Sequence, residues 1–203
     1  MRKHSATNRD KTMTNKTDEF WFLDSRIRVA VSQRSNGDRI SVLVHEASFG
    51  EAPPLHVHYG EDEIFHILDG EMEFDIDGTL TLAWPGDTIC APRGVPHRFR
   101  VISKRGARYL TVTRGGFEDL VRTFGSAPQG PGLPRHETPT PAMQAALASA
   151  CFANGINVIG PPMAASSRAL PFPPAEVSSC ERPSLHPVSP PSLPSRPQAL
   201  PKR

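Results

Sequence analysis

Three histidines and one glutamate in the middle of the chain have the types and spacing of ligands for a single metal ion. His56 and His58 are two residues apart, so on a β-strand both imidazoles point to the same face. Glu63 begins the next apolar run, and His97 follows a turn at residues 93–96. Three neutral nitrogens and one carboxylate suit one divalent transition metal ion, such as iron, manganese, nickel, cobalt, copper or zinc.

Neighbouring polar residues are expected to have other roles. His66 alternates away from the face of Glu63, and His45 precedes the ligand segment, so each is expected at the surface or behind a ligand. Glu61 and Asp62 are expected to be solvated acids of a loop. The alternative for the four candidate ligands is that they line the fold without an ion, but unpaired polar groups inside a protein would be costly.

Apolar residues accompany the candidate ligands on the expected strands. Four of them fall on the same strand faces as the ligands: Phe65, Ile67, Phe99 and Val101. The simpler interpretation is that they form the core of the fold. The alternative is that they form an apolar pocket beside the metal for an aromatic or otherwise hydrophobic ligand.

Short strands separated by turns account for the chain between residues 26 and 113. Apolar and polar residues begin to alternate at Ile27, and Asp-Gly pairs interrupt this pattern at residues 69–70 and 77–78. Asp-Gly between alternating runs predicts a β-hairpin. Many short strands at regular spacing, without helices between them, predict an all-β antiparallel sandwich or barrel.

Beyond the strands, the apolar period changes to that of helices. Apolar residues at i, i+3, i+4 and i+7 predict a helix at about residues 117–124 that packs on the barrel. A second stripe, from Met143 to Cys151, predicts a helix at about residues 141–154. Residues 156–159 could add a short final strand.

Composition divides the chain into one domain and two tails. Residues 1–19 are polar and charged, and residues 161–203 hold 12 of the 22 prolines with almost no apolar period. Such segments cannot bury enough apolar surface to offset the entropy of ordering them, so both are expected to be disordered. The folded domain is expected at residues 20–160.

Charge, cysteines and hydropathy limit the class of protein. Outside the two tails, 13 basic residues face 16 acidic ones, which argues against a nucleic-acid partner. The three cysteines are odd in number and widely spaced, which favours a reducing, cytoplasmic setting. No apolar run has the length of a signal peptide or a membrane span, so neither secretion nor a membrane partner is expected.

The residues around the candidate ligands match the two sequence motifs of the cupin superfamily. The first motif is glycine, five residues, His-x-His, three or four residues, Glu, six residues and glycine, and it is met by Gly50, His56, His58, Glu63 and Gly70. The second is glycine, five residues, proline, one residue, glycine, two residues and His, and it is met by Gly86, Pro92, Gly94 and His97. Val101 replaces the final asparagine of the second motif, which is not a metal ligand in the family.

The resemblance implies a cupin jelly-roll β-barrel that holds one metal ion and is frequently a homodimer. Flanking residues resemble the quercetin-dioxygenase-like branch. By this likeness the chain is expected to be a metal-dependent oxygenase, an oxidoreductase acting on a small organic molecule, with phenols as one candidate class. Glu63, if it leaves the metal, would act as the catalytic base. The alternatives are a non-catalytic module that binds or senses a small molecule, and non-redox chemistry such as isomerisation.

Overall fold

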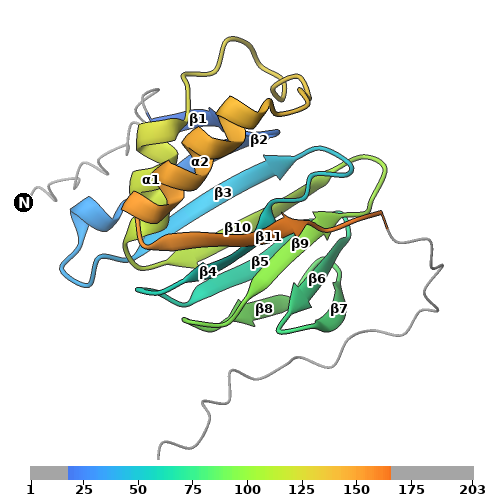
Figure 1. Ribbon diagram of the computed structural model, residues 1–203, viewed down its shortest axis with the longest axis horizontal. Coiled ribbons are helices and arrows are strands. Elements are labelled where there is room, and N and C mark those ends of the chain that lie inside the picture. Colours follow the sequence, from blue (N-terminus) through green and yellow to red (C-terminus); the bar gives the residue numbers. More distant parts are fainter. Residues whose placement is uncertain (1–17, 166–203) are drawn as a thin grey trace, which may run out of the picture.

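The computed structural model describes residues 18–165, which form a β-sandwich flanked by two helices (Figure 1). Most of the two segments expected as tails, residues 1–17 and 166–203, lies outside the described residues. The strands of the described part are β1 (Glu19–Phe22), β2 (Ser25–Val31), β3 (Ser41–Ala47), β4 (Pro54–His58), β5 (Glu63–Asp69), β6 (Met72–Ile76), β7 (Thr79–Ala83), β8 (Thr88–Ala91), β9 (His97–Val101), β10 (Ala107–Thr113) and β11 (Ile156–Pro162). The sandwich therefore includes strands on both sides of the expected segment 26–113.

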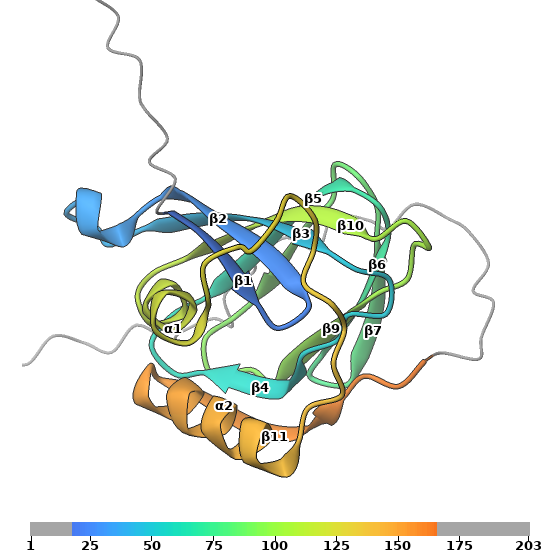
Figure 2. The same cartoon turned by 90° about the horizontal axis from the view of Figure 1, so that it is seen from above.

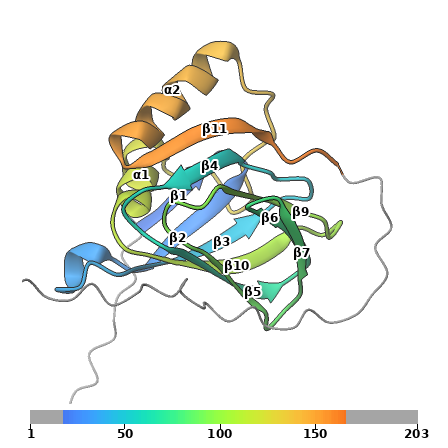
Figure 3. The same ribbon diagram turned by 60° about the horizontal axis from the view of Figure 1, so that its bottom comes forward.

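The strands form two facing antiparallel sheets with the connectivity of a jelly roll (Figure 3). One sheet has the order β1-β2-β3-β10-β5-β8, and the other has the order β11-β4-β9-β6-β7. β3 to β10 make the jelly roll itself, whereas β1, β2 and β11 extend its two sheets at their edges. The expected all-β jelly-roll fold with two C-terminal helices is confirmed.

The two Asp-Gly turns differ in what they connect. Asp77 and Gly78 both have positive φ, 51° and 79°, and join the paired strands β6 and β7, which confirms a hairpin there. Gly70 also has positive φ, but it joins β5 of one sheet to β6 of the other. The hairpin predicted at residues 69–70 is therefore wrong. A Cβ on Gly70 would lie 2.5 Å from the carbonyl oxygen of Gly106, so this crossing requires glycine.

Two apolar clusters fill the part of the molecule that the structure describes. The first lies between the facing sheets and is rich in aromatic side chains: Phe65, Phe74, Phe99 and Tyr109 are all buried in it. The second lies between the sheet edge and the helices, and its buried members include Phe22, Ile27, Leu43, Leu120 and Ile156. The metal-ligand candidates sit where these two clusters adjoin.

Two helices close one side of the sandwich. α1 (Gly116–Phe124) and α2 (Pro141–Ala153) contact each other, and α2 also lies against β11 (Figure 2). The stripe expected on α2 is buried only toward its C-terminal end, because Met143 is 47% exposed while Cys151 is buried. Neither helix of the described residues is long and apolar enough to cross a membrane.

A buried carboxylate ties α1 to the first sheet. Glu118 is fully buried and accepts hydrogen bonds from Ser32 Oγ (2.6 Å), Gln33 N (2.7 Å), Ser41 Oγ (2.6 Å) and Arg122 Nε (2.7 Å). Burial alone would raise the pKa of Glu118, but these four donors hold it below its usual value. The position of α1, and of the side chains it places over the site, therefore depends on an ionised Glu118.

Candidate metal centre

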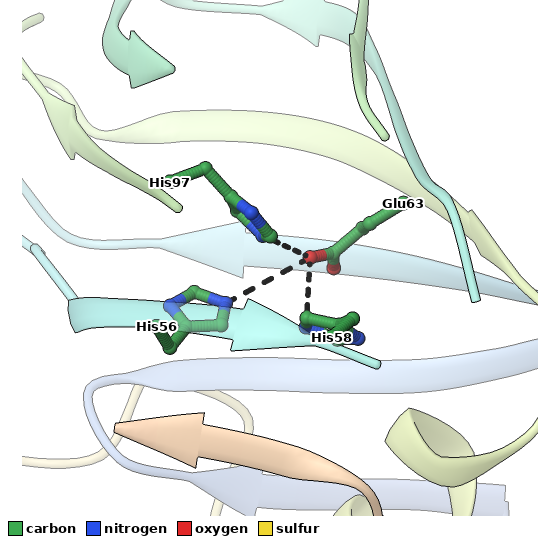
Figure 4. Close-up of side chains that lie close together, drawn as sticks. All are labelled: His56, His58, Glu63 and His97. Atoms are coloured by element: carbon green, nitrogen blue, oxygen red, sulfur yellow. Dashed lines mark hydrogen bonds and ion pairs between the residues drawn. The ribbon is translucent and has the colours of Figure 1, made fainter. Parts of the chain in front are cut away.

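The four expected ligands converge on one point between the two sheets (Figure 4). His56 and His97 are directly paired neighbours on β4 and β9, and His58 follows on β4. Glu63 reaches toward them from the start of β5 in the opposite sheet. One potential ligand atom from each residue lies within 4.8 Å of the others, so the spacing of the sequence motif becomes a compact cluster in the fold.

The imidazole nitrogens of this cluster face Glu63. The Nε2 atoms of His58 and His97 each lie 3.3 Å from Glu63 Oε2, and that of His56 lies 4.0 Å from the same oxygen. All four side chains are enclosed: that of His56 is 12% exposed and the other three no more than 4%. The cluster is therefore shielded from bulk water.

The opposite edge of each ring is held by a hydrogen-bond acceptor. His56 Nδ1 lies 2.8 Å from the carbonyl oxygen of Pro54, and His97 Nδ1 lies 2.9 Å from that of Val95. A carbonyl oxygen accepts only, so these Nδ1 atoms must carry hydrogen. In the neutral tautomers the Nε2 lone pairs are then free and directed at the cluster, which is the arrangement of histidine ligands around a metal ion.

Glu61 fixes the third ring and was not anticipated in this role. Its carboxylate lies 3.1 Å from His58 Nδ1 and accepts hydrogen bonds from the backbone N–H groups of Arg114 (2.7 Å) and Phe117 (3.1 Å). Glu61 is 5% exposed, so the expectation that it is a solvated loop acid is wrong. The sequence held one weak signal, a spacing of three residues from His58. The two backbone donors come from residues more than 50 positions away.

Electrostatics within the cluster favour a cation. Burial alone would raise the pKa of Glu63, but the close approach of the His58, His56 and His97 rings holds it well below its usual value. Burial lowers the pKa of His56, which keeps that ring neutral. For His58 burial acts in the same direction, but Glu63 and Glu61 outweigh it and raise the pKa.

The donor set fits a divalent transition metal ion. An ionised carboxylate and three Nε2 lone pairs directed at one buried point repel one another unless a positive charge lies among them. Protons on the rings would supply part of this positive charge. One divalent ion would supply all of it, and imidazole and carboxylate are ligands that such ions prefer. The donors do not distinguish one transition metal from another.

An apolar cavity of about 70 Å³ opens beside the cluster. His56 and Glu63 form part of its wall, and Phe65 and Phe99, two of the four residues expected in a substrate pocket, line it as well. Ile67 and Val101, the other two, are fully buried in the core between the sheets and are not among the lining residues. The alternation of side chains along the strands correctly places Ile67 and Val101 on the inner face of the sandwich. The cavity, however, extends from the ligand cluster toward the helices, so these two residues do not reach it.

Other lining residues come from segments that the motifs do not cover. His45 stacks between Tyr109, with ring centroids 4.5 Å apart, and Phe117 of α1, at 5.9 Å. Its Nε2 lies 2.9 Å from Thr111 Oγ1, and burial lowers its pKa to about 4. His45 is therefore a neutral wall residue and does not belong to the ligand cluster. His66, hydrogen-bonded to Thr88 at 2.9 Å, also lies outside that cluster.

Known proteins resemble the part of the chain that carries this site. Residues 43–113 match the family model described as the Cupin domain (Cupin_2). A quercetin 2,3-dioxygenase from Bacillus subtilis is 33% identical over 98 residues, which are 48% of this chain and 29% of that protein. The chain thus matches less than a third of that relative's length.

Two solved structures are similar to part of this chain. The polyketide cyclase RemF from Streptomyces resistomycificus is 26% identical, with a TM-score of 0.40 over 44% of this chain and 64% of that chain. A predicted oxalate decarboxylase from Thermotoga maritima is 23% identical, with a TM-score of 0.42 over 44% of this chain and 79% of that chain. The family match spans all four clustered residues and most of the jelly roll, so residues 43–113 form a cupin domain whose clustered side chains make a candidate metal site.

Proposed function

We propose that this cupin is a metal-dependent oxygenase acting on a small, largely apolar organic molecule, with phenols as the first class to test. The observation that carries the proposal is the position of the ligand cluster in the wall of an apolar cavity. A ligand in that cavity would meet the metal site at one end and aromatic side chains around its body. The similarity to a quercetin 2,3-dioxygenase supports the same reaction class.

The residues of the site divide into those that hold the metal and those that shape the cavity. His56, His58, His97 and Glu63 would hold a divalent ion, which supplies Lewis acidity and, if redox-active, electron transfer with dioxygen. Phe65 and Phe99 keep the adjoining space apolar, which excludes water from the reacting groups.

Glu63 is the candidate general base for a substrate hydroxyl. The imidazoles around it hold its pKa low, so it is a weak base while those contacts last. A carboxylate that moves away from them loses the stabilisation of its ionised form, while burial still raises its pKa. Glu63 would therefore accept a proton most readily when substrate displaces it from the cluster.

The test begins with the metal and proceeds to turnover. Elemental analysis of the purified protein gives the resident ion, and anaerobic reconstitution with iron, manganese, cobalt, nickel or copper gives a matched series. Single-ring phenols should be assayed before flavonols, because a cavity of about 70 Å³ is well below the roughly 300 Å³ at the small end of pockets for larger ligands. Dioxygen uptake is measured, with incorporation of labelled oxygen into product.

The outcome distinguishes the proposal from its alternatives. Dioxygen uptake that requires both metal and substrate, and is lost in His97→Ala, would support the oxygenase. Ligand binding without uptake for any metal would favour a binding or sensing module, and a zinc-only site would favour non-redox chemistry. The homodimer, the cytoplasmic setting and the lack of nucleic-acid and membrane partners stay predictions.

A further inference from the structure

A second polar group lies in the cavity, apart from the metal ligands. Ser25 and Glu51 both line the cavity, and Ser25 Oγ lies 2.7 and 2.6 Å from the two carboxyl oxygens of Glu51. Ser25 is buried, and its hydroxyl also interacts with the buried Tyr109 side chain. Apart from Glu63, Glu51 is the only carboxyl among the residues described as lining this cavity.

Glu51 marks the outer end of the cavity. A larger groove adjoins the cavity on the outside, lined in part by the segment between α1 and α2, and Glu51, Pro53 and Pro54 line both spaces. His56 and Glu63 line only the inner cavity. A ligand that reaches the metal site from the groove would therefore pass Glu51 and could contact both ends at once.

The protonation state of Glu51 suits a neutral ligand group. Burial, supported by the charge of Asp24, raises the pKa of Glu51 to about 8, although the Ser25 hydroxyl acts in the opposite direction. At neutral pH the carboxyl is thus largely protonated, and the Ser25–Glu51 pair offers one donor and several acceptor sites without a net charge. A hydroxyl group, which both donates and accepts, matches this pair.

The backbone of this segment does not require a carboxyl here. The backbone of this segment pairs through Gly50 N to Val101 O and Val101 N to Glu51 O, contacts that any side chain would allow. A half-buried carboxyl in a largely apolar wall costs free energy that an apolar residue would avoid. Strongly shifted titratable groups in a cavity are characteristic of functional sites.

We propose that the Ser25–Glu51 pair binds a second polar oxygen of the substrate, so that the substrate class is a small aromatic or aliphatic molecule with one oxygen at the metal and a neutral hydroxyl or carbonyl at its far end. This inference rests on the proposed function, because it assumes that the substrate's other end meets the metal cluster. Glu51 thereby determines specificity.

Two matched ligand pairs test the inference on cobalt-substituted protein without dioxygen. Hydroquinone and 4-methylphenol differ only in a far hydroxyl against a methyl group, and 4-(hydroxymethyl)phenol and 4-ethylphenol repeat the comparison one carbon farther out. Dissociation constants are read from the visible absorption of the bound cobalt. One hydrogen bond to the pair should make the hydroxyl member of at least one pair bind roughly fivefold more tightly.

Variants assign that preference to Glu51. Glu51→Leu should reduce the preference for the hydroxyl ligand, because leucine offers no hydrogen bond and leaves only the Ser25 hydroxyl as a partner. Glu51→Gln retains a donor and an acceptor, so it should keep part of the preference for the hydroxyl ligand. Ser25→Ala should reduce this preference two- to threefold. Glu46→Gln, the same carboxyl-to-amide change at an exposed position of β3, is the control and should leave the preference unchanged.

The outcomes separate this inference from the proposed function. Two results would overturn the role of Ser25 and Glu51 while the phenol-binding metal site stands. One is equal affinity for the two ligands of each matched pair in the wild-type protein. The other is a preference for the hydroxyl ligand that keeps its full size in both Glu51→Leu and Glu51→Gln. A cobalt spectrum that none of the four phenols alters would overturn the proposed substrate class and this inference with it. If Glu51→Leu does not fold, the Glu51→Gln and Ser25→Ala series decides.

Discussion

Glu51→Gln should make the protein more stable than the wild type at alkaline pH and should have much less effect at acid pH. A half-buried carboxyl whose pKa is raised from 4.5 to about 8 binds its proton more tightly in the folded state than in the unfolded state. Its contribution to stability is therefore complete below pH 4.5 and is lost as the pH rises toward 8. Glutamine has nearly the same shape, can still accept from Ser25 and does not titrate.

The magnitude follows from the size of the shift. At about 1.36 kcal/mol per pKa unit, the wild-type protein should lose about 3.5 kcal/mol between pH 5 and pH 8 through Glu51 alone. The stability of Glu51→Gln relative to the wild type should therefore increase by about that amount over the same interval. Other groups, including His45 and the metal ligands, titrate in both proteins and cancel in this difference.

Urea unfolding of the metal-free proteins at pH 5 and pH 8, followed by tryptophan fluorescence, measures the effect. Glu46→Gln, at an exposed position, should show no comparable change. A relative stability of Glu51→Gln that changes by less than about 1 kcal/mol between the two pH values would refute the reasoning. It would mean that water reaches the carboxyl and that Glu51 is ionised at neutral pH.

Three further predictions concern the metal centre and its support. His97→Ala should bind metal at least about tenfold more weakly, whereas His66→Ala should keep the wild-type metal content, as elemental analysis after dialysis would show. Glu61→Gln should weaken metal binding by about 10- to 100-fold, because it loosens the hold on the His58 ring. Competition with a chelator measures the affinity, and an unchanged affinity would exclude this orienting role of Glu61. Glu118→Ala should lower the free energy of unfolding by about 3–5 kcal/mol, since it leaves buried donors without an acceptor; a loss below about 1 kcal/mol in urea titrations would contradict the assignment.

The sequence was most informative where local spacing alone determines geometry. His56 and His58 share a strand face because side chains alternate, and Asp77-Gly78 forms a hairpin because both residues adopt positive φ. The same reasoning failed at residues 69–70, where the chain crosses from one sheet to the other. An Asp-Gly turn does not specify which strand its neighbours pair with, since pairing depends on contacts with distant strands.

Residues that act through distant partners were the hardest to anticipate. Glu61 resembles a loop acid in the sequence, and only the approach of the Arg114 and Phe117 backbone buries it beside His58. Glu51 gave no signal either, because its partial burial and its contact with Ser25, 26 positions earlier, arise only in the folded chain. In both cases the decisive neighbours are brought together by packing between elements, which no local pattern encodes.

The sequence by itself determined the candidate ligand set for one metal ion, because the types and spacings of His56, His58, Glu63 and His97 are properties of the chain. Only the tertiary structure decided what surrounds that candidate site. Three ligands lie on one sheet and the fourth on the other, so the sandwich must close before they meet. The closure also places Phe65 and Phe99, but neither Ile67 nor Val101, in the cavity wall, and Glu51 at its outer end. Burial and distance are properties of the closed sandwich, and they set the charge and accessibility of each group.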